Sequence, residues 1–127
     1  MEGKKFVTAI NCMDGRVQLP VIQWMKHKYK ADFVDMITEP GPDKILCEKG
    51  FELDCQSIRK KVEISVKVHG SKIVAIVGHY DCAGNPTDKD TQIKQIKESI
   101  EKIRSWGFNA ETIGLWVDEN WEVSKIF

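Results

Sequence analysis

Short strand-like runs alternate with stretches of helical periodicity along most of this chain. Three runs rich in apolar residues read as strands, over 6–10, 33–37 and 73–77. Between them lie a helical segment that ends near Tyr29 and a longer one from about Asp54 to His69. Strands linked by helices long enough to cross over form a mainly parallel sheet with helices on both faces. We therefore expect an α/β fold.

The second half of the chain continues the alternation. Thr87 or Asp88 is expected to cap a helix whose apolar stripe is ended by Gly107. Residues 112–117 then read as a fourth strand. A tight turn leads into a last strand over 121–126, which we expect to run antiparallel to the fourth.

Thiol and imidazole side chains follow two of these strands. Cys12 comes just after the first strand, and His79 and Cys82 come just after the third. Ligands of open α/β sheets bind beyond the carboxyl ends of strands, so these loops can meet over one crevice. Two thiols and one imidazole make three zinc ligands with a fourth position open, as in catalytic zinc sites. The alternatives are a buried apolar Cys12 and a loop histidine satisfied by the backbone.

Asp14 and Arg16 lie two and four residues beyond the first thiol. They are within reach of whatever occupies the open position. They can form either a structural ion pair or a pair that acts in catalysis, and perturbed charges beside a metal favour the second.

Composition limits the partners of the chain. The 127 residues include 19 basic and 19 acidic side chains, so no basic excess points to nucleic acid. No apolar run is long enough to span a membrane, and the first residues lack the apolar stretch of a signal peptide. We expect a cytoplasmic protein with reduced thiols and one domain over residues 1–127. Its zero net charge favours self-association.

Other polar residues are given structural roles. Asp43 is expected to cap a short helical turn over 45–48. His69 is assigned to the end of the preceding helix and Asp81 to hydrogen bonds within its own loop. Cys47 and Cys55 have no histidine at a metal-binding spacing and are interpreted as core thiols.

The two loops together resemble a known family. Cys12-Met13-Asp14-Gly15-Arg16 resembles the Cys-x-Asp-x-Arg motif of the β-class carbonic anhydrases, and Gly78-His79-Tyr80-Asp81-Cys82 resembles their His-x-x-Cys motif. The closing segment from Ile113 to Asp118 is similar to their C-terminal strands, and Gly41 occupies the place of a family glycine. Both motifs occur in the family's order and on the expected elements.

The resemblance implies a sheet of order 2-1-3-4 with a last antiparallel strand and a dimer as the basic unit. It implies Zn²⁺ held by Cys12, His79 and Cys82, with Asp14 and Arg16 as a dyad beside the metal. The implied activity is that of a zinc lyase, a carbonate dehydratase, in which a zinc-bound hydroxide converts carbon dioxide to bicarbonate. In the family the fourth zinc position holds either water or the aspartate, and both arrangements stay open for Asp14.

The chain also departs from the family pattern. Thr38-Glu39-Pro40-Gly41 replaces an Arg-Asn-Ala-Gly stretch, Ala83 stands where glycine is usual, and the segment from Cys82 to the fourth strand is short. Little sequence precedes the first strand, where relatives carry helices that wrap a partner subunit. Two alternatives follow. One is a zinc-binding relative without hydratase activity, serving as a sensor or interaction domain, and the other is a zinc hydrolase for another small electrophile such as a carbon–sulfur compound.

Overall fold

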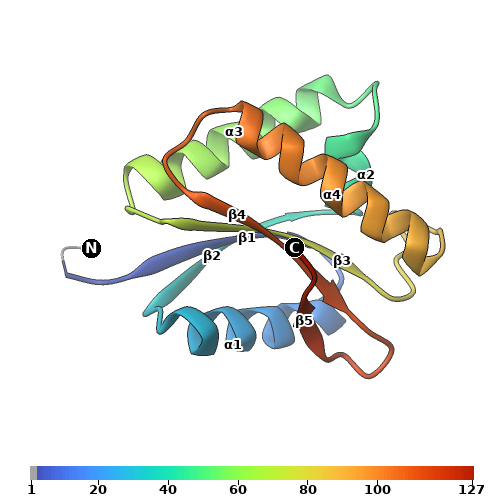
Figure 1. The fold of residues 1–127 in the computed structure, drawn as a ribbon, viewed down its shortest axis with the longest axis horizontal. Coiled ribbons are helices and arrows are strands. Elements are labelled where there is room, and N and C mark those ends of the chain that lie inside the picture. The colour runs from blue at the N-terminus through green and yellow to red at the C-terminus, as the bar shows by residue number, and fades with distance from the viewer. Residues whose placement is uncertain (1–2) are drawn as a thin grey trace.

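A five-stranded sheet in the order β2-β1-β3-β4-β5 forms the centre of the computed structural model, which describes residues 3–127 (Figure 1). Only the β4–β5 pair is antiparallel among the strand pairs of these residues. The expected α/β class, the order 2-1-3-4 and the antiparallel last strand are confirmed. The strands are β1 (Phe6–Cys12), β2 (Phe33–Glu39), β3 (Ile73–His79), β4 (Glu111–Val117) and β5 (Val123–Lys125).

Helices cover both faces of the sheet, as expected. A 3₁₀ turn, η1, leads into α1, which packs on one face, whereas α2, α3 and α4 pack on the other (Figure 1). None of the helices in residues 3–127 combines the length and apolar character that a membrane crossing requires. The helices are η1 (Gly15–Val17), α1 (Gln18–Tyr29), α2 (Pro42–Cys47), α3 (Glu52–Lys67) and α4 (Lys89–Ser105).

The ends of α3 and α4 and the start of α4 agree with the predicted caps. The Asp88 side chain accepts a hydrogen bond of 2.8 Å from the backbone of Thr91, so it is Asp88 that caps α4. Gly70 and Gly107 follow α3 and α4 with positive φ, where glycine carries no Cβ penalty. The predicted cap of α2 was wrong, because the N-cap is Gly41 and Asp43 lies inside the first turn with its side chain buried.

Two other structural predictions were also wrong. The His69 ring pairs with Asp35 of β2, with 2.6 Å between Nδ1 and Oδ2, and not with the helix end. The last strand covers only Val123–Lys125 because Trp121, with φ of 60°, belongs to the turn that Asp118 organises. A bulky side chain in the left-handed region cannot continue an extended strand.

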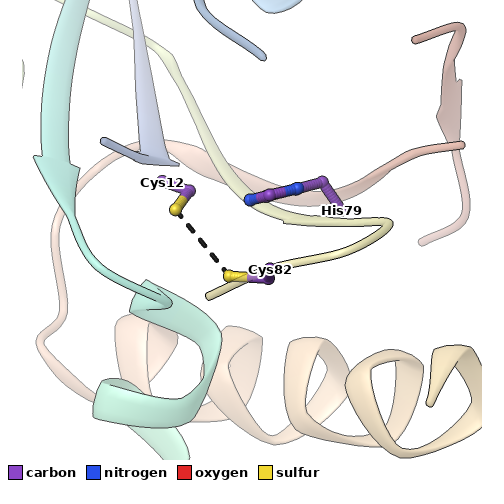
Figure 2. A group of neighbouring side chains, drawn as sticks. All are labelled: Cys12, His79 and Cys82. Carbon is purple, nitrogen blue, oxygen red and sulfur yellow. Dashed lines mark hydrogen bonds between the residues drawn. The ribbon is translucent and has the colours of Figure 1, made fainter. Parts of the chain in front are cut away.

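The sheet register brings the ends of β1 and β3 together. Thr8, Ala9 and Ile10 pair in parallel with Val74, Ala75 and Ile76. The two strands therefore reach the same edge, where the side chains of Figure 2 meet.

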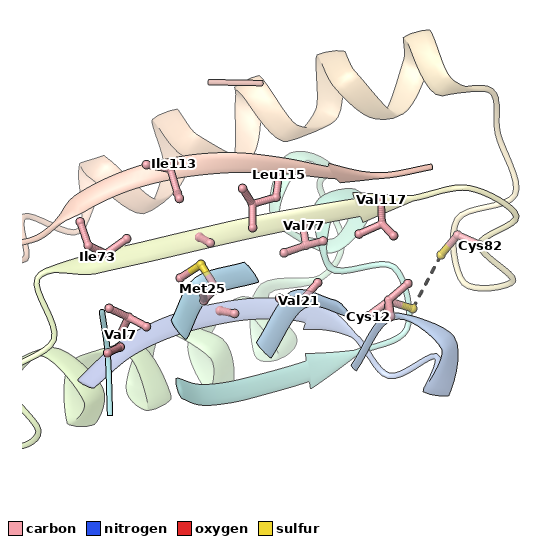
Figure 3. Close-up of a cluster of buried hydrophobic side chains, with 14 residues drawn as sticks. Val7, Cys12, Val21, Met25, Ile73, Val77, Cys82, Ile113, Leu115 and Val117 are labelled. Atoms are coloured by element: carbon pink, nitrogen blue, oxygen red, sulfur yellow. Dashed lines mark hydrogen bonds between the residues drawn. The ribbon is translucent and has the colours of Figure 1, made fainter. Parts of the chain in front are cut away.

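Two apolar cores hold the layers together. The first lies between the sheet and α1 and includes Val21 and Met25 of the helix against Val77 and Leu115 of the strands (Figure 3). The second lies between the sheet and the other three helices. Because Cys12 and Cys82 belong to the first core, packing fixes the loops that carry them.

Candidate metal centre

Cys12, His79 and Cys82 converge at the carboxyl edge of the sheet. Cys12 ends β1, His79 ends β3, and Cys82 lies in the loop between β3 and α4. Their sulfur and ring nitrogen atoms lie within 4.8 Å of one another, and all three residues are buried (Figure 2). Cys12 and Cys82 are 70 positions apart in the chain, so the parallel pairing of β1 and β3 builds the cluster.

The spacing of the sulfur atoms suits a tetrahedral ion. The Sγ atoms of Cys12 and Cys82 are 3.8 Å apart. Two thiolates that each lie about 2.3 Å from a tetrahedral zinc would be separated by about 3.8 Å. The donor set of two sulfurs and one imidazole is soft to borderline, which favours zinc over magnesium or calcium.

The His79 ring is oriented for a ligand. Its Nδ1 lies 2.8 Å from the carbonyl oxygen of Tyr80, and a proton on Nδ1 would be donated to that oxygen. The opposite nitrogen, Nε2, is then a lone-pair donor, and it is buried with no hydrogen-bond partner among residues 3–127. A buried polar atom without a partner is costly unless something fills its coordination. The residues present therefore fit a zinc ion.

The two thiols are electrically unequal before a metal binds. A hydrogen bond from the Cys82 thiol lowers the pKa of Cys12 to about 4. The neighbouring Cys12 sulfur raises the pKa of Cys82. The proximity of the two sulfurs thus favours the thiolate at Cys12 and the thiol at Cys82, and binding of a cation to both would release a proton because thiolates are the metal-binding form.

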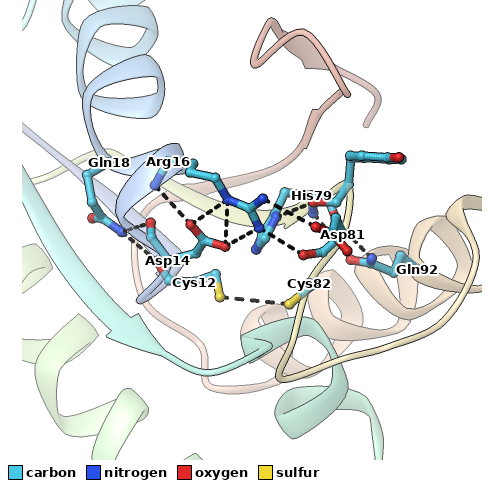
Figure 4. Close-up of polar contacts among 9 residues, drawn as sticks. Cys12, Asp14, Arg16, Gln18, His79, Asp81, Cys82 and Gln92 are labelled. Carbon is cyan, nitrogen blue, oxygen red and sulfur yellow. Dashed lines mark hydrogen bonds and ion pairs between the residues drawn. The ribbon is translucent and has the colours of Figure 1, made fainter.

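Asp14 and Arg16 form a bidentate pair beside the cluster (Figure 4). Arg16 Nη2 lies 2.7 Å from Asp14 Oδ2, and Nε lies 3.0 Å from Oδ1. These hydrogen bonds lower the pKa of Asp14 to about 2. Both carboxylate oxygens are engaged by the guanidinium, and Asp14 is not among the residues whose atoms could share an ion.

Arg16 also contacts Asp81 and Trp121. From the sequence, Asp81 was expected to serve its own loop and Trp121 to begin the last strand. Arg16 Nη1 lies 3.2 Å from Asp81 Oδ2, and Nη2 donates to the Asp81 carbonyl at 3.0 Å. The prediction that Asp81 serves its own loop was wrong. The guanidinium carbon also lies 4.6 Å from the centre of the Trp121 ring, a cation–π contact.

Buried amide side chains hold the ligand-bearing backbone. Gln92 of α4 accepts from the His79 N–H at 3.2 Å and donates to the His79 carbonyl at 2.8 Å. Gln18 of α1 donates to the carbonyls of Cys12 and Asp14 at 2.7 and 2.8 Å. These bonds fix the two strand ends against the helices that follow them.

A close approach of two glycines positions the Cys82 loop. A Cβ on Gly84 would lie 2.5 Å from the backbone carbon of Pro40 and 2.8 Å from the nitrogen of Gly41. Gly41 has φ of 63° and would meet Gly84 in return. The Asn85 amide donates to Asp43 Oδ1 at 3.1 Å across the same contact.

Sequence reasoning missed several of these supporting residues. Gln92 falls on the buried side of α4, four residues before Ile96, whereas Ile93 is only partly buried. A polar residue in register with an apolar helical stripe was the available signal.

The other two thiols, Cys47 and Cys55, are half-buried and donate to the carbonyls of Lys44 and Ile45. They take no part in the metal cluster.

Comparison with known proteins places the chain in a family. A family model described as "Putative carbonic anhydrase" matches residues 2–127. The chain belongs to this family. A search of curated proteins gave no match.

Solved structures of carbonic anhydrases share the fold. A chain from the crystal structures of two tetrameric β-carbonic anhydrases of Sordaria macrospora gives a TM-score of 0.56 at 12% identity, over 97% of this chain and 81% of that one. The β-carbonic anhydrase CcaA gives a TM-score of 0.61 at 14% identity, over 98% and 81%. CafA of Aspergillus fumigatus gives 0.51 at 12% identity, over 97% and 76%. At these identities the likeness concerns the fold.

Proposed function

We propose that this carbonic anhydrase family member reversibly hydrates carbon dioxide at a zinc ion held by Cys12, His79 and Cys82. The observation that carries the proposal is the unpartnered Nε2 of His79 facing two sulfur atoms 3.8 Å apart. A zinc ion bound there would lower the pKa of the water it holds and so supply hydroxide at neutral pH.

The chain's own residues would orient the reaction. Asp14 accepts hydrogen bonds through both carboxylate oxygens, and its low pKa keeps it ionised. An ionised carboxylate beside the open position can accept a hydrogen bond from the attacking group and so orient that group toward carbon dioxide. Arg16 keeps Asp14 charged and turned away from the ligand atoms.

The replaced loop after β2 does not introduce a charge into the cluster. Glu39 extends toward α3, where its carboxylate lies 3.9 Å from Lys61 Nζ.

We also propose that the protein is cytoplasmic. We propose that it forms a homodimer or larger homo-oligomer, because the relatives from Sordaria macrospora are tetrameric. The pocket would then be completed by the neighbouring subunit.

Stopped-flow hydration of carbon dioxide on protein of measured zinc content tests the proposal. Asp14→Asn removes the ionised hydrogen-bond acceptor but keeps the shape, so we expect kcat to fall by about 100-fold with zinc content unchanged. Asp54→Asn, on the exposed start of α3, is the matched control and should keep full activity.

Two results would contradict the proposal. Wild-type protein with one zinc per chain and no hydration would favour the zinc-binding relative or a carbon–sulfur substrate. Hydration that Asp14→Asn leaves intact would remove the role of the dyad.

A further inference from the structure

Arg16 is held on three sides although its side chain is 44% exposed. Its edge donates to Asp14, its end donates to Asp81, and its face lies over the Trp121 ring. Asp14 belongs to the loop after β1, Asp81 to the loop after β3, and Trp121 to the turn between β4 and β5. Three separate loops therefore meet at one guanidinium.

Two of the residues that contact Arg16 have a strained backbone conformation. Within residues 3–127, Lys30, Asp81 and Trp121 are the non-glycine residues with positive φ. Lys30 is the ordinary left-handed cap of α1. Asp81 and Trp121, with φ of 57° and 60°, both contact Arg16. A bulky aromatic residue in this region is a rare outlier, and such strain tends to cluster at functional sites.

The turn that carries Trp121 is closely braced. The Asp118 side chain accepts from the backbone of Asn120 and Glu122 at 2.9 and 3.0 Å. The Trp121 N–H donates to the Asp118 carbonyl at 3.0 Å. These bonds hold the left-handed conformation that directs the indole ring toward Arg16.

We infer that Trp121 is a positioning residue for the Asp14–Arg16 dyad. The cation–π contact with the indole ring holds the guanidinium where Arg16 binds both oxygens of Asp14. Asp81 fixes the other end of the same group. Because the Arg16 side chain is 44% exposed, the contact with the ring would restrict the rotamers that its solvent-facing side could otherwise adopt. The inference rests on the proposed function and adds the C-terminal hairpin to the site.

The test compares Trp121→Leu and Trp121→Phe with wild-type zinc-loaded protein. The side-chain Nε–H signals of Arg16, Arg59 and Arg104, the three arginines of the chain, can be followed by nitrogen NMR and assigned with Arg16→Lys. In the wild type we expect the Arg16 signal to be shifted by the indole ring current and protected from exchange. In Trp121→Leu we expect the shift to vanish and exchange with solvent to accelerate.

Kinetics supply the second readout. Because Trp121 acts through Arg16, Trp121→Leu should lower kcat by about tenfold with little change in KM. Trp121→Phe keeps a smaller aromatic face, so it should retain part of the ring-current shift and most of the activity. Trp106→Leu, at the C-terminal end of α4, is the control and should change neither the Arg16 signal nor kcat.

The outcomes separate this inference from the proposed function. An Arg16 signal that is the same in wild type, Trp121→Phe and Trp121→Leu would overturn the inference, even if the wild type hydrates carbon dioxide. An Arg16 signal that responds as expected, in a wild type without hydratase activity, would support the positioning role and refute the proposed function alone.

Discussion

The Asp43 carboxyl group is the most deeply buried acid near the metal cluster. Its side chain is 1% exposed, its Oδ1 accepts from Asn85, and its Oδ2 has no hydrogen-bond partner. A Cβ on Gly78 would lie 2.8 Å from that Oδ2 and 2.9 Å from Gln92 Oε1, so two acceptors border the same position. Burial raises the pKa of Asp43 to about 6.

This raised pKa has a defined effect on stability. The ordinary pKa of an aspartate, 3.8, applies to the unfolded chain, and the pKa in the folded protein is about 6. The folded state therefore binds the proton more tightly, so the carboxyl favours folding most below pH 3.8 and this contribution is lost as the pH rises through 6. Above pH 7 the ionised group costs about 3 kcal/mol relative to low pH. This loss of stability weakens the contact between α2 and the loop that carries Cys82, which the hydrogen bond from Asn85 to Asp43 joins.

We predict that Asp43→Asn is more stable than the wild type at pH 8 and nearly equal to it at pH 4. The asparagine oxygen can still accept from Asn85, and its amide replaces the protonated oxygen. Urea unfolding of zinc-free, reduced protein across this pH range measures the difference, expected to be about 1–3 kcal/mol at pH 8. Parallel pH profiles for the two proteins would argue against a buried, titrating Asp43.

At the scale of elements, the contact between the loop after β2 and the loop after β3 controls the position of Cys82. We predict that Gly84→Ala lowers the free energy of unfolding by about 1–3 kcal/mol, because its Cβ would overlap the backbone of Pro40 and Gly41. Zinc affinity should fall too, since the displaced loop carries a ligand. Denaturant unfolding and competition with a chelating dye give the two quantities.

Gly15→Ala provides the matched control for this substitution. A Cβ on Gly15 would meet nothing within 4 Å, and the residue has no positive φ, so the change should stay within about 0.5 kcal/mol. An equal loss of stability in both substitutions would argue against the loop contact as its cause, because alanine at a compatible glycine site does not by itself destabilise the fold.

Sequence patterns predicted the elements more completely than the contacts between loops. Local apolar runs and caps such as Asp88 identify helices and strands, and strand order places Cys12 near His79. Asp81 and Asp43 were assigned local roles and Trp121 was assigned to the last strand, because the residues that they contact lie on elements far away in sequence. A left-handed Trp121 leaves no mark in composition or periodicity, since only the three-dimensional turn requires it.

At the scale of the whole molecule, the proposed zinc ligands Cys12 and His79 end the two central strands of the parallel region. An ion that binds the native cluster, but not the unfolded chain, stabilises the fold by mass action. At a free zinc concentration a thousand times the Kd, binding would stabilise the fold by about 4 kcal/mol. We therefore predict that removing zinc with a chelator lowers Tm by roughly 10–20 °C. Differential scanning calorimetry with and without chelator measures this shift.

Cys82→Ser serves as the reference for that measurement. It removes one sulfur ligand, so its Tm should be close to that of the chelated wild type and should respond little to chelator. A chelator effect as large in Cys82→Ser as in the wild type would place the stabilising ion elsewhere.

The two sulfur atoms at the edge of the sheet also make zinc-free protein sensitive to oxidation. Thiols 3.8 Å apart are close enough for peroxide to take their hydrogens, form water and join them in a disulfide, unless a bound cation occupies both sulfurs. Preparations stripped of zinc in air would therefore lose the capacity to be reloaded. Reduction with dithiothreitol before reconstitution should restore it.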